Sequence, residues 1–139
     1  MNYLLDTCVI SEFVKPTPHS ALLEWLAVIP SDALFLSVIT IGEIRKGMSK
    51  LAESKKKIQL TLWVNTLIAE YDDRILPIDL AVSERWGILQ GQAEKAGTPM
   101  PSLDGLIAAT ASVYNLTIVT RNEQDFLPSH LSLINPWKF

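Results

Sequence analysis

Short apolar runs alternate with longer amphipathic segments along this chain, and this alternation limits the possible folds more than any other feature. Strand-like runs lie at residues 2–5, 33–37, 74–78, 116–120 and 131–134. Segments with helical spacing lie between them, at residues 8–14, 21–29, 41–51, 55–71, 80–97 and 103–115. Strands that alternate with helices predict an α/β fold: three α/β/α layers around a central, mainly parallel sheet of four to five strands.

Residues that favour helix ends refine these boundaries. Four helices follow a residue that is expected to occupy the N-cap position: Ser20, Thr40, Asp79 and Ser102. Gly97 is placed to end the helix that starts after Asp79. Pro77 lacks a backbone donor and therefore suits an edge or an end of the sheet.

Length and composition predict one globular domain, residues 1–139, with a substantial core. The charged fraction of 19% is low, so we expect a partner, such as a second copy of the chain, to cover part of the apolar surface. The net charge of −3 gives no overall attraction to nucleic acid. Nucleic-acid binding would have to rest on a local basic patch and on metal.

The single cysteine and the absence of long apolar runs predict a cytoplasmic protein. Cys8 cannot form an intrachain disulfide, which fits a reducing compartment. The first ten residues lack the basic region of a signal peptide, and no run is long enough to cross a bilayer.

Four acidic residues lie where predicted strands or helices begin or end: Asp6, Glu43, Asp104 and Asp125. Asp6 ends the first strand and Asp125 lies just past the strand at 116–120, whereas Glu43 and Asp104 are expected in the first turns of helices. Strand ends and helix starts share one edge of a doubly wound sheet, so the four side chains are expected to converge there.

Converging carboxylates repel one another unless a cation neutralises them, and oxygen ligands favour Mg²⁺ or Mn²⁺. Zinc would more often recruit cysteine or histidine, but His19 and His130 lie in proline- and serine-flanked loops and are expected to face solvent. The acids therefore predict a magnesium site of the kind that handles phosphates.

Each acid also has a purely structural explanation when it is considered alone. Asp6 could cap the following helix, and Asp104 could favour the positive end of its helix. Glu43 could pair with Lys46 one turn further on, and Asp125 could form an Asx-type turn. Their joint placement favours the metal site.

Four stretches, LLDTCVISEF, SVITIGEIRKG, PMPSLDGLIAATA and TIVTRNEQDF, resemble in this order the motifs of PIN-domain ribonucleases. More specifically, the chain resembles the VapC- and FitB-type toxins of prokaryotic toxin–antitoxin modules, and this resemblance extends from residue 4 to residue 126. It implies a PIN-like fold, a homodimer, and a small cognate antitoxin of the VapB, FitA or Phd kind. It also implies hydrolysis of RNA, such as tRNA or another structured RNA, by metal-activated water.

Residue by residue, the resemblance assigns the catalytic, metal-binding acids to Asp6, Glu43, Asp104 and Asp125. These would hold one or two Mg²⁺ ions, with Mn²⁺ as a substitute. Thr120 matches a hydroxyl residue that often supports the site, and Thr7 is a second candidate. Gly105 departs from the alanine that relatives often carry after the third acid.

Basic residues near the acids are candidates for contacts to an RNA backbone. Arg121 adjoins the predicted site, and Arg45 and Lys46 begin a basic stretch around a helix–helix turn that continues with Lys50, Lys55, Lys56 and Lys57. A solvated surface explains this stretch equally well.

Four tryptophans are expected in core or subunit contacts, with base stacking as the alternative: Trp25, Trp63, Trp86 and Trp137.

Three other functions compete with the ribonuclease. A haloacid-dehalogenase-type phosphatase needs a second aspartate two residues after Asp6, where this chain has Cys8. Cys8 is itself a poor nucleophile candidate, because no histidine is placed to activate it. A PIN-like module that binds RNA or a partner without cleavage, and a nuclease that acts on DNA, remain open.

Overall fold

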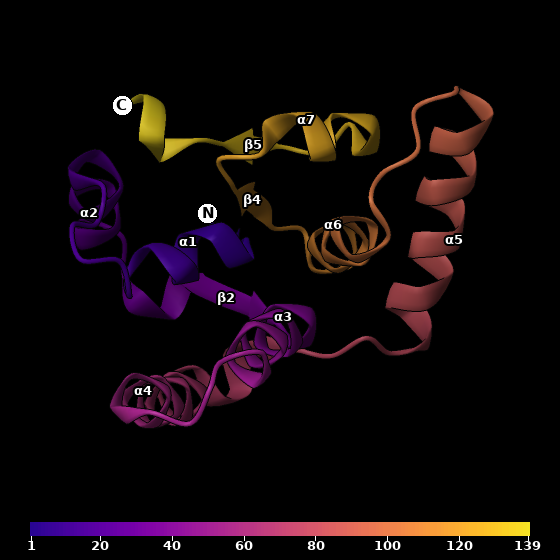
Figure 1. Cartoon of the computed structure of the whole chain (residues 1–139). Helices are drawn as coiled ribbons and strands as arrows, with labels where there is room; N and C mark the ends of the chain where they lie inside the picture. Colours follow the sequence, from indigo (N-terminus) through magenta and orange to yellow (C-terminus); the bar gives the residue numbers. More distant parts are fainter.

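One parallel sheet organises the chain, and the computed structural model describes all of it, residues 1–139 (Figure 1). Its strands are β1 (Tyr3–Leu5), β2 (Leu34–Ser37), β3 (Ile75–Leu76), β4 (Thr117–Val119) and β5 (Leu133–Ile134). They lie in the order β3-β2-β1-β4-β5, and every neighbouring pair is parallel. The predicted α/β fold is therefore confirmed, with five strands, and Pro77 follows an edge strand.

Helices cover both faces of this sheet. They are α1 (Thr7–Glu12), α2 (Ser20–Ala27), α3 (Val38–Ser49), α4 (Lys55–Tyr71), α5 (Leu80–Lys95), α6 (Ser102–Tyr114) and the short α7 (Glu123–Phe126). α5 and α6 lie on one side of the molecule, and α1, α2 and α4 lie on the other (Figure 1). Every helix is too short or too polar to traverse a bilayer.

Alternating side chains along the strands divide the core into two layers. Leu4 and Ile118 are fully buried and pack on the layer that includes residues of α6 and the ring of Phe126. Their neighbours Leu5 and Val119 are also fully buried but belong to the opposite layer, with residues of α1, α2 and α4. Successive residues of a strand point to opposite faces, which explains why these strands are apolar without interruption.

Three predicted helix caps are wrong. The cap of α3 is Ser37, whose hydroxyl accepts a hydrogen bond from the Ile39 N–H at 3.0 Å, because α3 begins directly after β2 without a loop. Thr40 is therefore inside the first turn of α3 and buried. Ser20 and Ser102 are the first residues of α2 and α6, and the cap positions before them make no side-chain hydrogen bond.

The ends of α5 follow the prediction. The Asp79 carboxylate accepts a hydrogen bond from the Val82 N–H at 3.0 Å and caps the helix. Gly97 has φ +78°, a left-handed conformation that side chains disfavour, and it lies just after the last helical turn.

The strand order reverses beside β1, whose neighbours are β2 and β4. The backbone N–H of Asp6 donates to the Val119 carbonyl at 2.9 Å and extends the β1–β4 pairing by one residue. In open parallel sheets the crevice for ligands forms at such a reversal, outside the carboxyl ends of the strands. The acids lie around this point.

Candidate metal and active site

Asp6 is held rigidly at the end of β1 by bonds to both of its carboxylate oxygens. Oδ1 accepts a hydrogen bond from the Thr7 N–H at 2.8 Å, so Asp6 also caps α1. Oδ2 accepts one from the hydroxyl of the fully buried Thr120, which follows β4, at 2.8 Å. The Thr120 hydroxyl in turn accepts a bond from the Asn122 N–H at 2.9 Å. Burial raises the pKa of Asp6 above its ordinary value in spite of these bonds.

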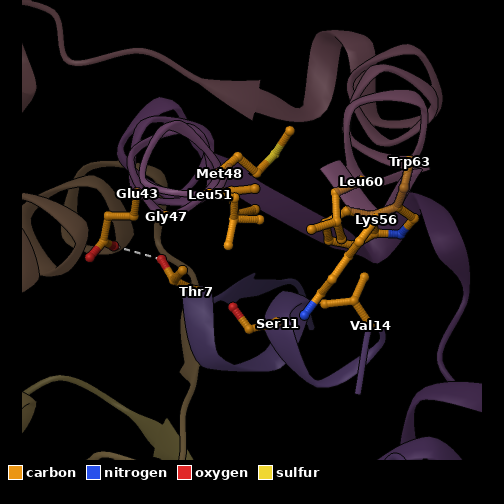
Figure 2. Close-up of a pocket in the computed structure, with 11 residues that line it drawn as sticks. Thr7, Ser11, Val14, Glu43, Gly47, Met48, Leu51, Lys56, Leu60 and Trp63 are labelled. Atoms are coloured by element: carbon orange, nitrogen blue, oxygen red, sulfur yellow. Dashed lines mark hydrogen bonds between the residues drawn. The ribbon is translucent and has the colours of Figure 1, made fainter. Parts of the chain in front are cut away.

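Glu43 approaches Asp6 through Thr7. The Thr7 hydroxyl donates to Oε1 of Glu43 at 2.6 Å, as Figure 2 shows, and lies 3.2 Å from the hydroxyl of Thr40. Glu43 lies in the second turn of α3, not in the first turn as predicted, because α3 starts at Val38. The alternative pairing with Lys46 is not formed, since the three ion pairs of the structure involve other residues.

The pKa of Asp104 depends on the charges of the other three acids. This residue lies in the first turn of α6, and its pKa is raised from 3.8 to about 7. Burial is the main cause, followed by the negative charges of Asp6, Asp125 and Glu43. Asp125 is partly buried in α7, the short helix after β4. The structure therefore brings the four predicted acids into one electrostatic neighbourhood.

These carboxylates affect one another through their charges without forming a tight cage. No three His, Cys, Asp or Glu side chains have the close spacing of a closed metal site. The two observations are compatible because charges act over longer distances than direct ligand contacts, and like charges favour separation. The four carboxylates are thus close enough for their charges to interact, but no three of them are close enough to bind one metal ion directly.

The available donors suit a hard cation. Carboxylate and hydroxyl oxygens dominate, whereas the two histidines, His19 and His130, are exposed in loops as predicted. Cys8 lies 3.5 Å from Oδ2 of Asp6, and burial together with that charge raises the pKa of its thiol to about 11. A thiol that stays protonated is a poor nucleophile. The residues therefore fit Mg²⁺ or Mn²⁺.

The basic residues near the acids differ in their contacts. The Arg121 guanidinium lies over the ring of Trp137, 5.5 Å from its centroid, and its backbone N–H donates to Cys8 at 3.5 Å. Arg45 donates to the Asn65 side chain on α4 at 2.8 Å and so connects two helices. Lys46 is exposed and forms no ion pair.

Gly105 is explained by the tryptophan above it. A Cβ at this position would lie 3.0 Å from Nε1 and 3.2 Å from Cδ1 of Trp86, closer than side-chain carbons normally approach. The glycine beside Asp104 therefore makes room for the indole of α5.

Two cavities on either side of Glu43 were not predicted. The larger cavity, about 290 Å³, is lined by Thr7, Glu43 and apolar residues that include Trp63 (Figure 2). The smaller cavity, about 160 Å³, is lined by Val38, Ile39, Gly42, Glu43, Lys46 and Leu103. Thr40 was also not predicted as a neighbour of the acids. It lies three residues before Glu43 on the same helix, and this spacing indicates that the two side chains share a helix face.

Comparisons with known proteins agree with this architecture. The PIN domain family matches residues 3–127. The VapC ribonuclease Y4jK of Sinorhizobium fredii is 36% identical over 139 residues, which cover 97% of each protein. The toxin FitB of Neisseria gonorrhoeae is 35% identical over 135 residues, covering 96% of this chain and 97% of FitB.

A solved structure gives the same result in three dimensions. The crystal structure of FitAcB from Neisseria gonorrhoeae contains a chain that superposes with a TM-score of 0.94 at 34% identity, with 99% of both chains covered. Sequence and structure agree over nearly the whole length, and the chain belongs to the PIN-domain family, with the VapC and FitB toxins among its relatives.

Proposed function

We propose that this chain is a Mg²⁺-dependent endoribonuclease that cleaves tRNA or another structured RNA, and that it acts in the cytoplasm as the toxin of a toxin–antitoxin pair. The observation that carries the proposal is the proximity of Asp6, Asp125 and Glu43 to Asp104, since their charges, after burial, add to the rise of its pKa. Relatives named as a VapC ribonuclease and as toxin FitB support the substrate class and the biological role.

Asp6, Asp104 and Asp125 would hold one or two Mg²⁺ ions, with Mn²⁺ as a substitute, and Glu43 would bind metal or orient the attacking water. When bound, the metal supplies an activated water and stabilises negative charge on the phosphate. The protein's own contribution is rigidity around the carboxylates. Thr120 and the Thr7 N–H fix the carboxylate of Asp6.

Each fixed carboxylate keeps acceptor capacity for a ligand. The Thr7 hydroxyl engages Oε1 of Glu43, which leaves Oε2 for the crevice. Oδ1 of Asp6 accepts one hydrogen bond and keeps a further lone pair, whereas Oδ2 accepts bonds from the Thr120 hydroxyl and the Cys8 thiol. Arg121 stands beside this group and would contact a phosphate of the RNA, as would Lys46 at the mouth of the smaller cavity.

The test is the Asp104→Asn variant, compared with Asp73→Asn as a control at an exposed acid. Asp104→Asn is expected to abolish Mg²⁺-dependent cleavage of bulk tRNA while circular dichroism remains that of the parent. Asp73→Asn should cleave like the parent. A DNA strand of matching sequence in the same assay distinguishes the two nucleic acids. Cleavage by Asp104→Asn at the parental rate would contradict the proposed active site.

A cognate antitoxin would inhibit the enzyme by docking beside the acids. The larger cavity supports this proposal, because it joins Glu43 and Thr7 to an apolar lining on α3 and α4. Ile58 and Leu62, one turn apart on α4, are 60% and 62% exposed and form a separate apolar strip, on the face of α4 opposite to the cavity-lining Leu60 and Trp63. A second copy of the chain, in the homodimer that the resemblance implies, would cover other exposed apolar residues.

A further inference from the structure

The smaller cavity opens directly beside the acids, and its chemistry differs from theirs. Its lining combines the carboxylate of Glu43 with apolar side chains from α3 and with Leu103 from the first turn of α6. Of the four acids only Glu43 lines the cavity, and Leu103 is the residue before Asp104 in α6. A phosphate held beside Glu43 would place its neighbouring nucleotide at this cavity, because Glu43 belongs to both.

Two apolar residues of this cavity are partly exposed in spite of their charged surroundings. Val38 is 38% exposed and Leu103 is 40% exposed. Apolar surface beside a charged site favours a ligand that has both an apolar face and a charged group. A nucleotide is such a ligand, because its base presents a flat π-face and its backbone carries the phosphate.

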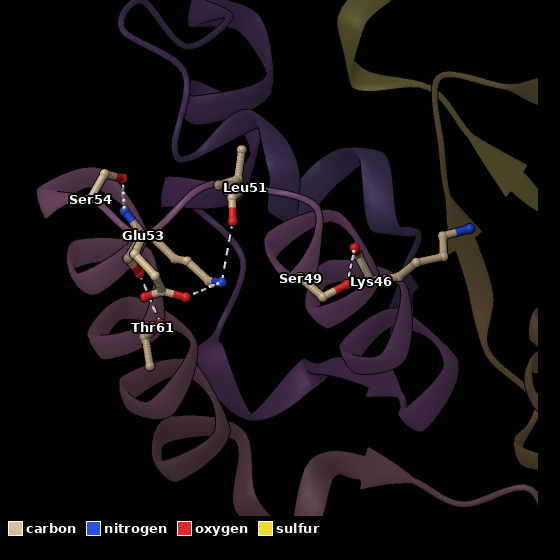
Figure 3. A network of polar contacts seen from close by, with 7 residues as sticks. Lys46, Ser49, Leu51, Glu53, Ser54 and Thr61 are labelled. Carbon is tan, nitrogen blue, oxygen red and sulfur yellow. Dashed lines mark hydrogen bonds and ion pairs between the residues drawn. The ribbon is translucent and has the colours of Figure 1, made fainter.

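Lys46 supplies the positive charge that a phosphate needs at this position. It lines the cavity, it is exposed, and no carboxylate of the protein neutralises it. Its side chain extends from α3 away from the turn that carries Glu53 and Ser54 (Figure 3). At that turn Lys57 is already paired with Glu53 at 2.8 Å, so the basic stretch is not uniformly free.

We propose that the smaller cavity is a base-binding subsite, which holds one unpaired base of the RNA next to the scissile phosphate while Lys46 contacts the adjacent backbone. This inference rests on the proposed nuclease function and adds a determinant of substrate recognition. The cavity's volume of about 160 Å³ suits one planar base. Drug-sized ligands occupy about 300–1,000 Å³. The larger cavity, with its mainly apolar lining, suits protein side chains.

Two glycines of α3 allow each cavity to be filled separately. Gly42 lines the smaller cavity and Gly47 lines the larger one. A Cβ built on either glycine meets no atom within 4 Å, so a side chain can start at either position without a clash at its first carbon. Leucine also favours helices over glycine, and both substitutions are expected to leave the fold intact. Gly91 on α5 is equally open, lines neither cavity and provides the control.

Gly42→Leu is expected to lower kcat/KM for RNA by roughly 10–100-fold, the range expected when one ring-sized apolar group loses its burial. Mg²⁺ affinity, melting temperature and antitoxin binding should match those of the parent. Gly47→Leu should weaken antitoxin binding while RNA cleavage is retained, and Gly91→Leu should change neither. Lys46→Gln should weaken RNA binding and reduce the slope of log Kd against log salt concentration by about one. Lys46→Arg should retain the parental affinity and the parental slope.

Unchanged RNA cleavage in Gly42→Leu would overturn the subsite and leave the proposed nuclease function intact. Failure of the parent to cleave RNA with Mg²⁺ would instead refute the nuclease function. In that case the subsite is tested by the binding of RNA to the Asp104→Asn protein, measured by fluorescence anisotropy. Adding Gly42→Leu to that protein should raise the Kd for RNA. An unchanged Kd would overturn the proposal. If light scattering shows that Gly42→Leu alters the oligomeric state, the cavity is a subunit contact and the proposal is also wrong.

Discussion

Asp104→Asn is expected to stabilise the metal-free protein, although the same change should stop catalysis. The pKa of Asp104 is raised from 3.8 to about 7 by burial and by the charges of Asp6, Asp125 and Glu43. Asparagine has nearly the shape of aspartate but cannot ionise. The substitution therefore removes the penalty of burying a charge and the repulsion among the acids.

The size of this effect follows from the shift in pKa. Roughly three pKa units at about 1.4 kcal/mol each give an upper bound near 4 kcal/mol for a group fully shielded from water. Asp104 is partly exposed, and solvent screening reduces the expected gain in the free energy of unfolding to about 1–2 kcal/mol. For a chain of this length, that gain raises the melting temperature by about 3–8 °C.

The gain should depend on pH. Because the pKa of the folded state lies above that of the unfolded state, the carboxyl is neutral in both states below about pH 4 and causes no penalty there. As the pH rises from about 4 to about 7, the unfolded state ionises first and the parent loses stability relative to the variant. The difference should be absent near pH 4 and complete near pH 8.

Thermal unfolding in EDTA at these two pH values, followed by circular dichroism, measures the effect. Asp73→Asn, in the 3₁₀ turn Asp72–Arg74, is the matched control and should melt like the parent at both values. Added Mg²⁺ should raise the melting temperature of the parent and leave that of Asp104→Asn nearly unchanged. The reasoning is refuted if Asp104→Asn melts below the parent near pH 8, or if the difference is the same at both pH values.

Three further variants probe the surroundings of the acids. Thr120→Val removes the hydroxyl that binds Asp6 and is expected to reduce the unfolding free energy by about 1–3 kcal/mol, with Mg²⁺ affinity lowered about 10–100-fold by calorimetry, whereas Thr120→Ser should retain both. Cys8→Ala should cleave RNA like the parent. In the parent, Cys8 should resist iodoacetamide at about pH 8, because a thiol pKa of about 11 leaves little thiolate. Rapid alkylation of Cys8 would contradict this expectation. Phe126→Ala empties a fully buried site and should lower the unfolding free energy by about 3–5 kcal/mol in a urea titration, and a loss below about 1 kcal/mol would show that the core collapses around it.

Local patterns were sufficient to predict the five strands and the six longer helices, but not the short α7. The helix at 55–71 has the bounds of α4, and Asp79 and Gly97 mark the two ends of α5, because capping and left-handed glycines act within a few residues. The errors at Ser20, Thr40 and Ser102 concern one to three residues each. They arise because α3 begins directly after β2 and because α2 and α6 begin at the serine itself, so that the cap lies one to three residues before the polar residue.

The acids themselves were also recognisable from short motifs, but the hydrogen bonds that threonines donate to them were not. Thr120 binds Asp6 across 114 residues, and Thr7 binds Glu43 across 36. These bonds exist because β4 lies beside β1 and because α3 begins without a loop after β2. Neither fact is encoded in the local periodicity of the chain.

The primary sequence thus specified strands, helices and the charged side chains at their ends, since those properties depend on neighbouring residues. Only the packed molecule specified which strands are adjacent, how deeply each carboxyl is buried and where the two cavities flank Glu43. These properties depend on how helices cover the two faces of the sheet, and so they are set by contacts between residues that lie far apart along the chain.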